Sequence, residues 1–439
     1  MHQHRAIQQY LQKYAEPEAE TAAQIQWPQN YRYTLLIPAY RESARLIDRL
    51  IKIADDCQNL LIILVVNRPD TNTDKTCNQA LIQRVHQLKK YESSTIATLT
   101  LYSLNPNSDL LCVDRDQCGA PIPIKQGVGL ARKIAADIAA TLMTKKIVSS
   151  HWIHSTDADT LIPKHYFSNL DDIDPRHYAA AVHPYKHISD DNKPISLAMK
   201  LYELRLHYYV EGLRYAKSPY AHHTLGSCLS ASLIHYCQVR GYPKRSGAED
   251  FYLLNKLRKT GGIFQHQRHQ LHIISRLSDR VPFGTGPAVI DLSSSIFPLQ
   301  EKIFYHPKCF EALKTALDCS LRFFGNVIPK TPAELEAELL KTNNDTELCQ
   351  LLSAGLFKCN WARALQHCQQ QGKNQASFER HFLIWFDGFR TLKLIHYLRD
   401  EAYSNIDAIE LLESIKRYEF IIDTVIFESL QDICDKSKH

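Results

Sequence analysis

Two aspartates separated by one small residue are the feature of the sequence with the clearest chemical use. Asp157 and Asp159 follow an apolar pair, Trp152 and Ile153, and precede Pro163, which suits the first turn of a helix. Both carboxylates therefore leave the end of a predicted strand, where they can converge on one divalent cation. Mn²⁺ or Mg²⁺ is the expected ion, because the ligands are hard oxygens. A structural alternative stays open, since aspartates also cap helices and close turns.

A second acidic pair, Glu249 and Asp250, opens a predicted helix whose apolar positions are Phe251, Leu254 and Leu257. Acidic residues in a first turn stabilise a helix by interacting with its free amides and its dipole, which is the structural interpretation of the pair. A carboxylate in that position can also accept a proton from a substrate, which is the chemical interpretation.

The segment before the first predicted helix of the sheet region is a third candidate. Residues 35–37 form an apolar strand that Pro38 stops, and a turn leads to a helix beginning near Ser43. The turn carries Ala39, Tyr40, Arg41 and Glu42. Ligands of open α/β sheets bind beside such strand ends, so we expect a ligand here.

Taken in their order along the chain, the segments 38–42, 157–159 and 249–250 resemble those of the nucleotide-diphospho-sugar transferases of the GT-A fold, most closely the family 2 glycosyltransferases, over about residues 31–290. The resemblance implies transfer of a sugar from a UDP- or GDP-sugar to an acceptor hydroxyl that the sequence does not identify. It implies that Asp157 and Asp159 hold Mn²⁺ or Mg²⁺ on the donor diphosphate. It also implies that Asp250 is the general base of an inverting displacement, with Glu249 orienting the loop or the acceptor. The nucleoside pocket would be lined by Pro38, Ala39, Tyr40 and Glu42.

Further donor contacts are expected at the entry of another helix. Gly127 and Gly129 begin this predicted helix, whose open amides would favour an anion. The resemblance assigns donor binding to Gly127, Arg132 and Lys133. The glycine pair lacks the full spacing of a dinucleotide fingerprint and does not directly follow a strand, which excludes a Rossmann oxidoreductase. Asn67 stands where the family usually has an aspartate that reads the base, so the choice of nucleoside stays open.

Basic residues that follow the second acidic pair are expected to neutralise the departing diphosphate. Arg276 and Arg280 are the candidates, because they run into a glycine-rich loop, residues 281–287, whose amides could contact phosphate or sugar. Many enzymes of this fold take a third metal ligand from a histidine in this neighbourhood, and His272 is the nearest one to Arg276. Gly226 opens a Gly-Ser step that resembles the floor beneath the transferred sugar.

The order of predicted elements places these groups on an α/β fold. Apolar strands alternate with helical periodicities, which predicts a mainly parallel sheet flanked by helices, with a ligand crevice at the carboxyl ends of its strands. The predicted strands are 33–38, 60–66, 95–101 and 152–155, the predicted helices are 46–53, 80–88 and 129–143, and a long polar loop covers 102–125.

The sequence predicts three regions along the chain. A polar helical extension precedes the sheet, and from about Phe304 the pattern is helical only. In the tail the predicted helices are 310–324, 334–340, 347–369 and 378–403. The predicted regions are an N-terminal helical extension (1–30), a GT-A catalytic domain (31–295) and a helical C-terminal region (296–439).

Composition narrows the class of protein. With 439 residues, 44% of them hydrophobic, the chain can form two folded cores, and its net charge of +5 argues against a nucleic-acid binder. No aliphatic run is long enough to span a membrane, the N-terminus is polar, and the 12 cysteines lack metal-binding spacing, so we expect a cytoplasmic protein with free thiols. Aromatic residues from Phe378 to Phe389 are expected to be mostly buried by packing on the catalytic domain, and any exposed part would suit peripheral contact with a membrane.

Two other functions stay open. A sugar-1-phosphate nucleotidyltransferase shares the sheet topology and the metal carboxylates, but it should carry a glycine-rich loop with Arg and Lys directly after the first strand. Residues 38–42 are not such a loop. A non-catalytic protein would use residues 300–439 for interaction and the preceding domain only to bind a nucleotide. The presence of both acidic pairs argues against it.

Overall fold

The two longest aliphatic runs form neighbouring central strands, β1 (Tyr33–Ala39) and β2 (Leu60–Asn67). They run parallel and in register, with Tyr33 opposite Leu60 and Ala39 opposite Val66. Every residue of β2 is buried, as is usual for a parallel strand that is covered on both faces. Both strands lie where the sequence predicts them, because a short continuous aliphatic run is typical of such a strand.

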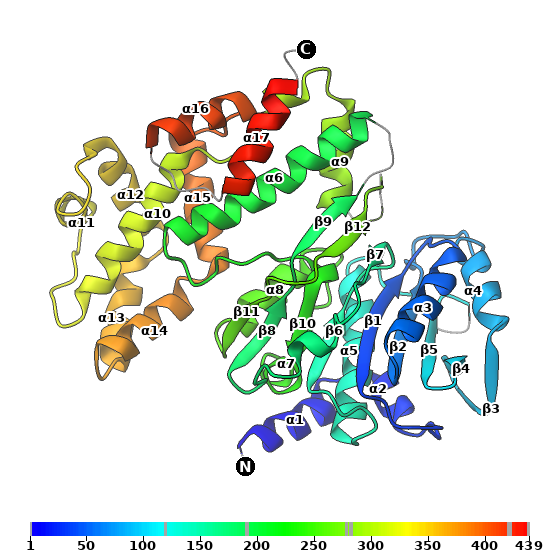
Figure 1. Cartoon of the computed structure of the whole chain (residues 1–439). Helices are drawn as coiled ribbons and strands as arrows, with labels where there is room; N and C mark the ends of the chain where they lie inside the picture. Colours follow the sequence, from blue (N-terminus) through cyan, green and yellow to red (C-terminus); the bar gives the residue numbers. More distant parts are fainter. Residues whose placement is uncertain are drawn as a thin grey trace. The chain divides into compact units, whose positions relative to one another are not determined.

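The computed structural model describes residues 2–117, 121–188, 193–276, 280, 284–418 and 424–436. The chain divides into two units, whose elements can be found in Figure 1 by their labels and by the colours that follow residue number. The first unit comprises residues 1–191 and 224–287, and the second comprises residues 192–223 and 288–439. All strands of the described residues lie in the first unit, whereas the second is built from helices.

A nine-stranded mixed sheet forms the centre of the first unit. Its other strands are β3 (Lys89–Ile96), β4 (Leu99–Asn105), β5 (Ser108–Arg115), β6 (Trp152–Ser155), β8 (Tyr178–Val182), β10 (Leu229–Ser232) and β11 (Gly262–Gln265). The strand order is β11-β8-β10-β6-β1-β2-β5-β4-β3. Strands β6, β1, β2 and β5 form a parallel block, so their carboxyl ends meet at one edge. Antiparallel pairing joins β10 to β6 and β8, and β4 to β5 and β3.

A second, smaller sheet continues from the same edge. It consists of β7 (Thr160–Leu161), β12 (Leu271–Ile274) and β9 (Tyr185–Ile188), in the order β7-β12-β9. Strand β12 is antiparallel to β7 and parallel to β9. Because β7 follows β6 directly in the chain, the turn between them lies where the two sheets meet.

Helix α5 (Gly127–Thr144) supports the central strands. It is buried over most of its length and packs on β1, β2 and β6, where it shares one core with Leu36, Leu61 and Ile63. Its sequence is apolar on nearly all sides, as expected for a helix enclosed within a domain. The other helices of the first unit are α1 (His2–Lys13), α2 (Pro17–Ala22), α3 (Arg45–Asp56), α4 (Gln79–His86), α7 (Leu233–Gln238) and α8 (Glu249–Leu257).

The N-terminal extension is two helices, not one, and a buried polar cluster fixes it to the rest of the first unit. Helix α1 packs on α7, and α2 packs on α5. Asp137 of α5 is fully buried and accepts hydrogen bonds from the hydroxyls of Tyr10 and Tyr236, the latter over 2.8 Å. Lys133 donates to Asp137 over 2.8 Å and to the Tyr10 hydroxyl over 2.7 Å. A buried carboxylate without these partners would be costly, so the cluster holds α1 in place.

The second unit is a helical assembly around one aromatic core. Its helices are α6 (Lys193–Tyr215), most of α9 (Thr285–Ser294), α10 (Pro307–Ser320), α11 (Pro332–Leu339), α12 (Thr346–Lys358), α13 (Trp361–Gln371), α14 (Gln375–Trp385), α15 (Gly388–Glu401), α16 (Ala408–Tyr418) and α17 (Thr424–Lys436). Phe378, Phe382 and Phe386 are at most 2% exposed, whereas Phe389 is 37% exposed. The first three side chains are buried as predicted, but the core that holds them consists of second-unit residues and not of the catalytic domain on which the sequence predicts them to pack.

Several predicted boundaries in the tail differ from the observed ones, for local reasons. The predicted helix 347–369 is broken at Asn360, whose φ of 60° is left-handed and ends the helical path between α12 and α13. The predicted helix 378–403 is broken before Asp387, whose side chain accepts a hydrogen bond from the amide of Arg390 and caps α15. Neither break carries a proline, the strongest sequence signal for a helix end.

Two differences concern longer segments. Residues 102–125, predicted as a polar loop, contain strand β5, whose Leu110, Leu111 and Val113 are buried. Helix α6 belongs to the second unit, although the sequence places it within the predicted catalytic region 31–295. Its Leu201 and Tyr208 pack in the core that holds Phe310. Among the described residues, no helix has the length and apolar character needed to cross a membrane.

Candidate active site

The turn between β6 and β7 carries both aspartates of the first acidic pair. The amide of Thr156 donates to the carbonyl of Leu36 over 3.0 Å, which attaches the turn to β1. The amide of Thr160 donates to the carbonyl of Asp157 over 3.1 Å and closes the turn. We refer to residues 156–160 as the carboxylate turn. It lies at the carboxyl ends of the parallel strands β6 and β1, where the sequence predicts the ligand crevice.

A single buried arginine joins the carboxylate turn to the second acidic pair. Arg132 of α5 donates to Asp157 over 2.5 Å and to Glu249 over 2.9 Å. It also donates to the hydroxyl of Ser155 over 2.8 Å. Burial opposes its charge, but the two carboxylates raise the pKa of Arg132, so it stays a cation. The two acidic segments, distant in sequence, therefore meet around one guanidinium group.

Asp250 lies beside this pair at the start of α8, in a position suited to proton exchange. Its carboxylate accepts hydrogen bonds from the amides of Gly226 over 2.8 Å and Phe251 over 2.7 Å. Burial and the charge of Glu249 raise the pKa of Asp250 to about 7, against the opposing effect of Arg132. A carboxylate with this pKa can both accept and release a proton near neutral pH.

Glycine at position 226 avoids a close contact with the buried guanidinium group of Arg132. It begins a short 3₁₀ turn (Gly226–Cys228) ahead of β10. A Cβ atom on Gly226 would lie 2.6 Å from Nη2 of Arg132, which is closer than atoms can approach. The absence of a side chain thus lets the Gly226 backbone reach Asp250 while Arg132 keeps both of its carboxylate partners.

Two further arginines face carboxylates at the other end of the carboxylate turn. Arg276 contacts Asp159 over 2.9 Å and binds both oxygens of Glu42, over 2.6 and 2.9 Å. Arg280 also donates to Glu42. Burial opposes ionisation of Glu42, but Arg276 and Arg280 outweigh it and lower the pKa of this carboxyl. Arg276, Arg280 and Glu42, all predicted from the sequence, thus lie together with Asp159.

The donor set of the carboxylate turn fits the predicted metal. Burial and then the charge of Asp157 raise the pKa of Asp159, so the two carboxylates are close enough to repel each other. Mg²⁺ and Mn²⁺ commonly take one or two protein carboxylates and complete their shell with phosphate and water. Within the described residues, no group of three or more His, Cys, Asp or Glu side chains is placed to hold an ion.

His272 is not part of such a group. It lies in β12 opposite Leu161, and its side chain is exposed, whereas its neighbours Leu271 and Ile273 are buried. The amide of Ile274 donates to the carbonyl of Asp159 over 2.9 Å, so the end of β12, and not His272, is attached to the carboxylate turn.

The carboxyl ends of β1, β2 and β5 form a polar edge next to this turn. Pro38 and Ala39 end β1, and the Tyr40 hydroxyl that follows accepts a hydrogen bond from Asn72 over 2.9 Å. At the end of β2, the carbonyl of Asn67 accepts from Asn78 over 3.0 Å. Buried and half-buried polar groups thus line the edge where the sequence predicts the nucleoside.

The glycine pair at the start of α5 has a packing role. Gly127 has a φ of 40°, and a Cβ atom there would lie 2.7 Å from Cα of Ser246. The amide of Gly129 donates to the carbonyl of Arg245 over 2.9 Å, so it is not open to an anion. Both glycines let the segment before α8 approach α5. Lys133 also lies away from the predicted donor contacts, because its ammonium group binds Asp137 and Tyr10.

Four residues at the site were not predicted. Arg49 of α3 donates to the carbonyl of Ala158 over 2.6 Å and so holds the carboxylate turn between its two aspartates. Asp116, just after β5, binds Arg68 over 2.5 Å and Asn78 over 3.0 Å at the polar edge. The apolar run before Asp116 was a usable signal for β5, but nothing in the sequence indicates the contact of Arg49. Residues 281–283 of the predicted glycine-rich loop lie outside the described residues.

Comparisons with known proteins add no assignment to this geometry. No protein-family model matches the chain, and no curated protein is similar enough to count as a relative.

Proposed function

We propose that the first unit transfers a sugar from a nucleotide-diphosphate sugar to an acceptor hydroxyl, with inversion and with dependence on Mn²⁺ or Mg²⁺. The observation that carries this proposal is the position of Arg132, which contacts both Asp157 and Glu249. Arg132 thereby connects the aspartate pair that is suited to bind a cation with the second acidic pair, which contains Asp250, the proposed general base. The resemblance of these segments to family 2 glycosyltransferases supplies the class of donor.

The donor diphosphate would lie between the carboxylate turn and the two arginines. Asp157 and Asp159 would hold the cation, which neutralises the negative charge that the leaving group gains as its bond to the sugar breaks. Arg276 and Arg280 are bound to carboxylates in the structure, and a guanidinium group that pairs with a carboxylate pairs equally well with a phosphate. The nucleoside would lie along the polar edge that follows β1.

Asp250 would act on the acceptor. Its carboxylate accepts the proton of the acceptor hydroxyl while the hydroxyl oxygen bonds to the anomeric carbon. The bond between that carbon and the phosphate oxygen breaks, and the nucleoside diphosphate leaves with the electron pair. A single displacement of this kind inverts the anomeric centre. The amides of Gly226 and Phe251 hold Asp250 in place, and a pKa of about 7 matches the base to neutral conditions.

Calorimetry with nucleoside diphosphates tests the donor site. UDP and GDP are titrated into the wild-type protein and Asp159→Ala, each with and without MnCl₂. We expect binding of one nucleotide to strengthen about tenfold or more with Mn²⁺ in the wild type, and this gain to be lost in the variant. Asp172→Ala, an exposed aspartate of the same unit, is the matched control and should behave as wild type. Equal affinities under all conditions would remove the metal site from the proposal.

A further inference from the structure

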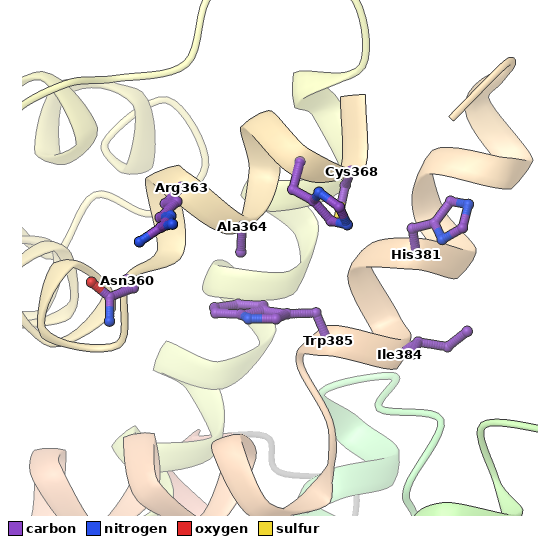
Figure 2. A pocket seen from close by; sticks show the side chains of 8 residues that line it. Asn360, Arg363, Ala364, Cys368, His381, Ile384 and Trp385 are labelled. Carbon is purple, nitrogen blue, oxygen red and sulfur yellow. The ribbon is translucent and has the colours of Figure 1, made fainter. Parts of the chain in front are cut away.

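The second unit contains a pocket that the proposed function does not use. It lies between α13 and α14 and has a volume of about 430 Å³. Figure 2 shows the indole of Trp385 reaching from α14 beneath Ala364 of α13, towards Asn360 at the start of that helix. Pockets that bind small organic molecules commonly measure about 300–1,000 Å³, so this one is large enough for a ligand of nucleotide size.

The polar side chains of this pocket carry positive charge or hydrogen-bond donors. Arg363 and His367 come from α13, and His381 comes from α14. The eight side chains that line the pocket in the described part of the chain include no carboxylate. Arg363 has no ion-pair or hydrogen-bond partner among the described residues, so its charge is free to pair with an anion.

The start of α13 adds to this positive potential. Asn360 precedes the helix in a left-handed conformation, and its side chain does not cap the first turn. The first turn contains no acidic residue either. The amides at the start of an uncapped helix carry partial positive charge, and Arg363 stands on the same turn. One end of the pocket therefore combines a guanidinium group with the positive end of a helix dipole.

The apolar part of the pocket is prearranged. The ring of Trp385 contacts that of Phe382, with centroids 5.9 Å apart, and the guanidinium of Arg390 lies 4.7 Å from the indole centroid. Arg390 also donates to the carbonyl of Trp385 over 2.6 Å. These contacts fix the indole, and Ala364, Cys368 and Ile384 complete the apolar lining. A ring stacked here would lose little side-chain entropy on binding.

We propose that this pocket binds a planar organic anion, with its ring against Trp385 and its negative group at Arg363 and the start of α13. Both aromatic carboxylates and nucleoside phosphates have this chemistry. The ligand would bind within the helical unit, separately from the donor site.

Fluorescence titration with 8-anilinonaphthalene-1-sulfonate, a planar aromatic anion, tests the site on the full chain. We expect one saturable site whose affinity falls about tenfold or more in Arg363→Gln, since hydrogen bonds to charged groups are the stronger ones. Ala364→Phe, which fills the pocket, should abolish the site. Arg380→Gln is the matched control, because Arg380 is an exposed residue of α14 that does not line the pocket.

Competition then distinguishes the two ligand classes. Displacement of the dye by indole-3-acetate supports a carboxylate, and displacement by UMP supports a phosphate. Displacement by uncharged indole at equal concentrations would overturn the requirement for an anion. Absence of a saturable site, or an unchanged affinity in Arg363→Gln with a wild-type melting temperature, would overturn the proposal even if Ala364→Phe fails to fold.

Discussion

Replacing Asp250 by asparagine should change the pH dependence of stability in a defined direction. Burial and the charge of Glu249 raise the pKa of Asp250 in the folded protein to about 7 from an ordinary value of 3.8. A carboxyl whose folded pKa is raised stabilises the protein at low pH, where it is protonated. That contribution is lost as the pH rises through the folded pKa. Asp250→Asn removes this titration, so the variant should lose less stability than wild type at high pH.

The size of the effect follows from the two pKa values. Between pH 5 and pH 8 the unfolded aspartate stays ionised, whereas the folded one loses its proton. Linkage then lowers the wild-type free energy of unfolding by about 2 to 3 kcal/mol across this range. The asparagine must turn its NH₂ group towards one of the amides of Gly226 and Phe251, which costs about 1–3 kcal/mol. This cost is the same at both pH values and cancels in the comparison.

Urea unfolding at pH 5 and pH 8 measures the effect. The difference in unfolding free energy between Asp250→Asn and wild type should shift in favour of the variant by about 2 to 3 kcal/mol at the higher pH. Asp172→Asn, which changes an exposed aspartate of the same unit, should follow the wild type at both pH values. An identical pH dependence in Asp250→Asn and wild type would show that Asp250 is ionised throughout, and the structural basis for its role as a base would be lost.

Three further outcomes are expected. In the proposed reaction, kcat/KM of the wild type should rise with pH and level off above about 7. Asp250→Asn should retain a pH-independent rate that is reduced by about 10²–10⁴-fold. A wild-type pH profile in the variant would contradict the assignment of Asp250 as the base. Arg132→Met should lower the free energy of unfolding by about 3–5 kcal/mol, because Asp157 and Glu249 lose their shared cation. The control Arg176→Met, which removes an exposed ion pair, should change the free energy of unfolding little. Gly226→Ala should lower the free energy of unfolding by about 1–3 kcal/mol, since its Cβ would displace Arg132, and a crystal structure of the variant with Arg132 unmoved would contradict this.

The parts of the fold that the sequence predicts are those with a strong local pattern. β1 and β2 are continuous aliphatic runs, and α8 starts at Glu249 as expected. β5 was missed because only a short apolar run between two aspartates marks it. A local sequence pattern also does not indicate which other elements a helix packs against. For this reason α6 was assigned to the catalytic region, whereas it packs in the helical unit.

In the candidate site, too, some residues could be predicted from the sequence, whereas the contacts between them could not. Asp157, Asp159 and Asp250 were proposed from residue type, from their position at the ends of elements and from the resemblance to family 2 glycosyltransferases. Arg132 was expected to contact the donor, but nothing in the sequence indicates that it joins Asp157 to Glu249. Lys133 is adjacent to Arg132 and similar in charge, yet one position along a helix turns its side chain to Asp137 and the N-terminal helix. Such contacts depend on tertiary packing, which single-sequence patterns do not contain.

The most direct test of the proposed function is the product released from a panel of UDP- and GDP-sugars in the presence of MnCl₂. We expect free nucleoside diphosphate from one donor, formed by hydrolysis or transfer, with the release dependent on Mn²⁺. Release should be reduced by about 10²-fold or more in both Asp250→Asn and Asp159→Ala. Formation of pyrophosphate from a nucleoside triphosphate and a sugar 1-phosphate would instead indicate a nucleotidyltransferase. Donor binding with no release from any sugar nucleotide would contradict the proposal that this unit is a glycosyltransferase.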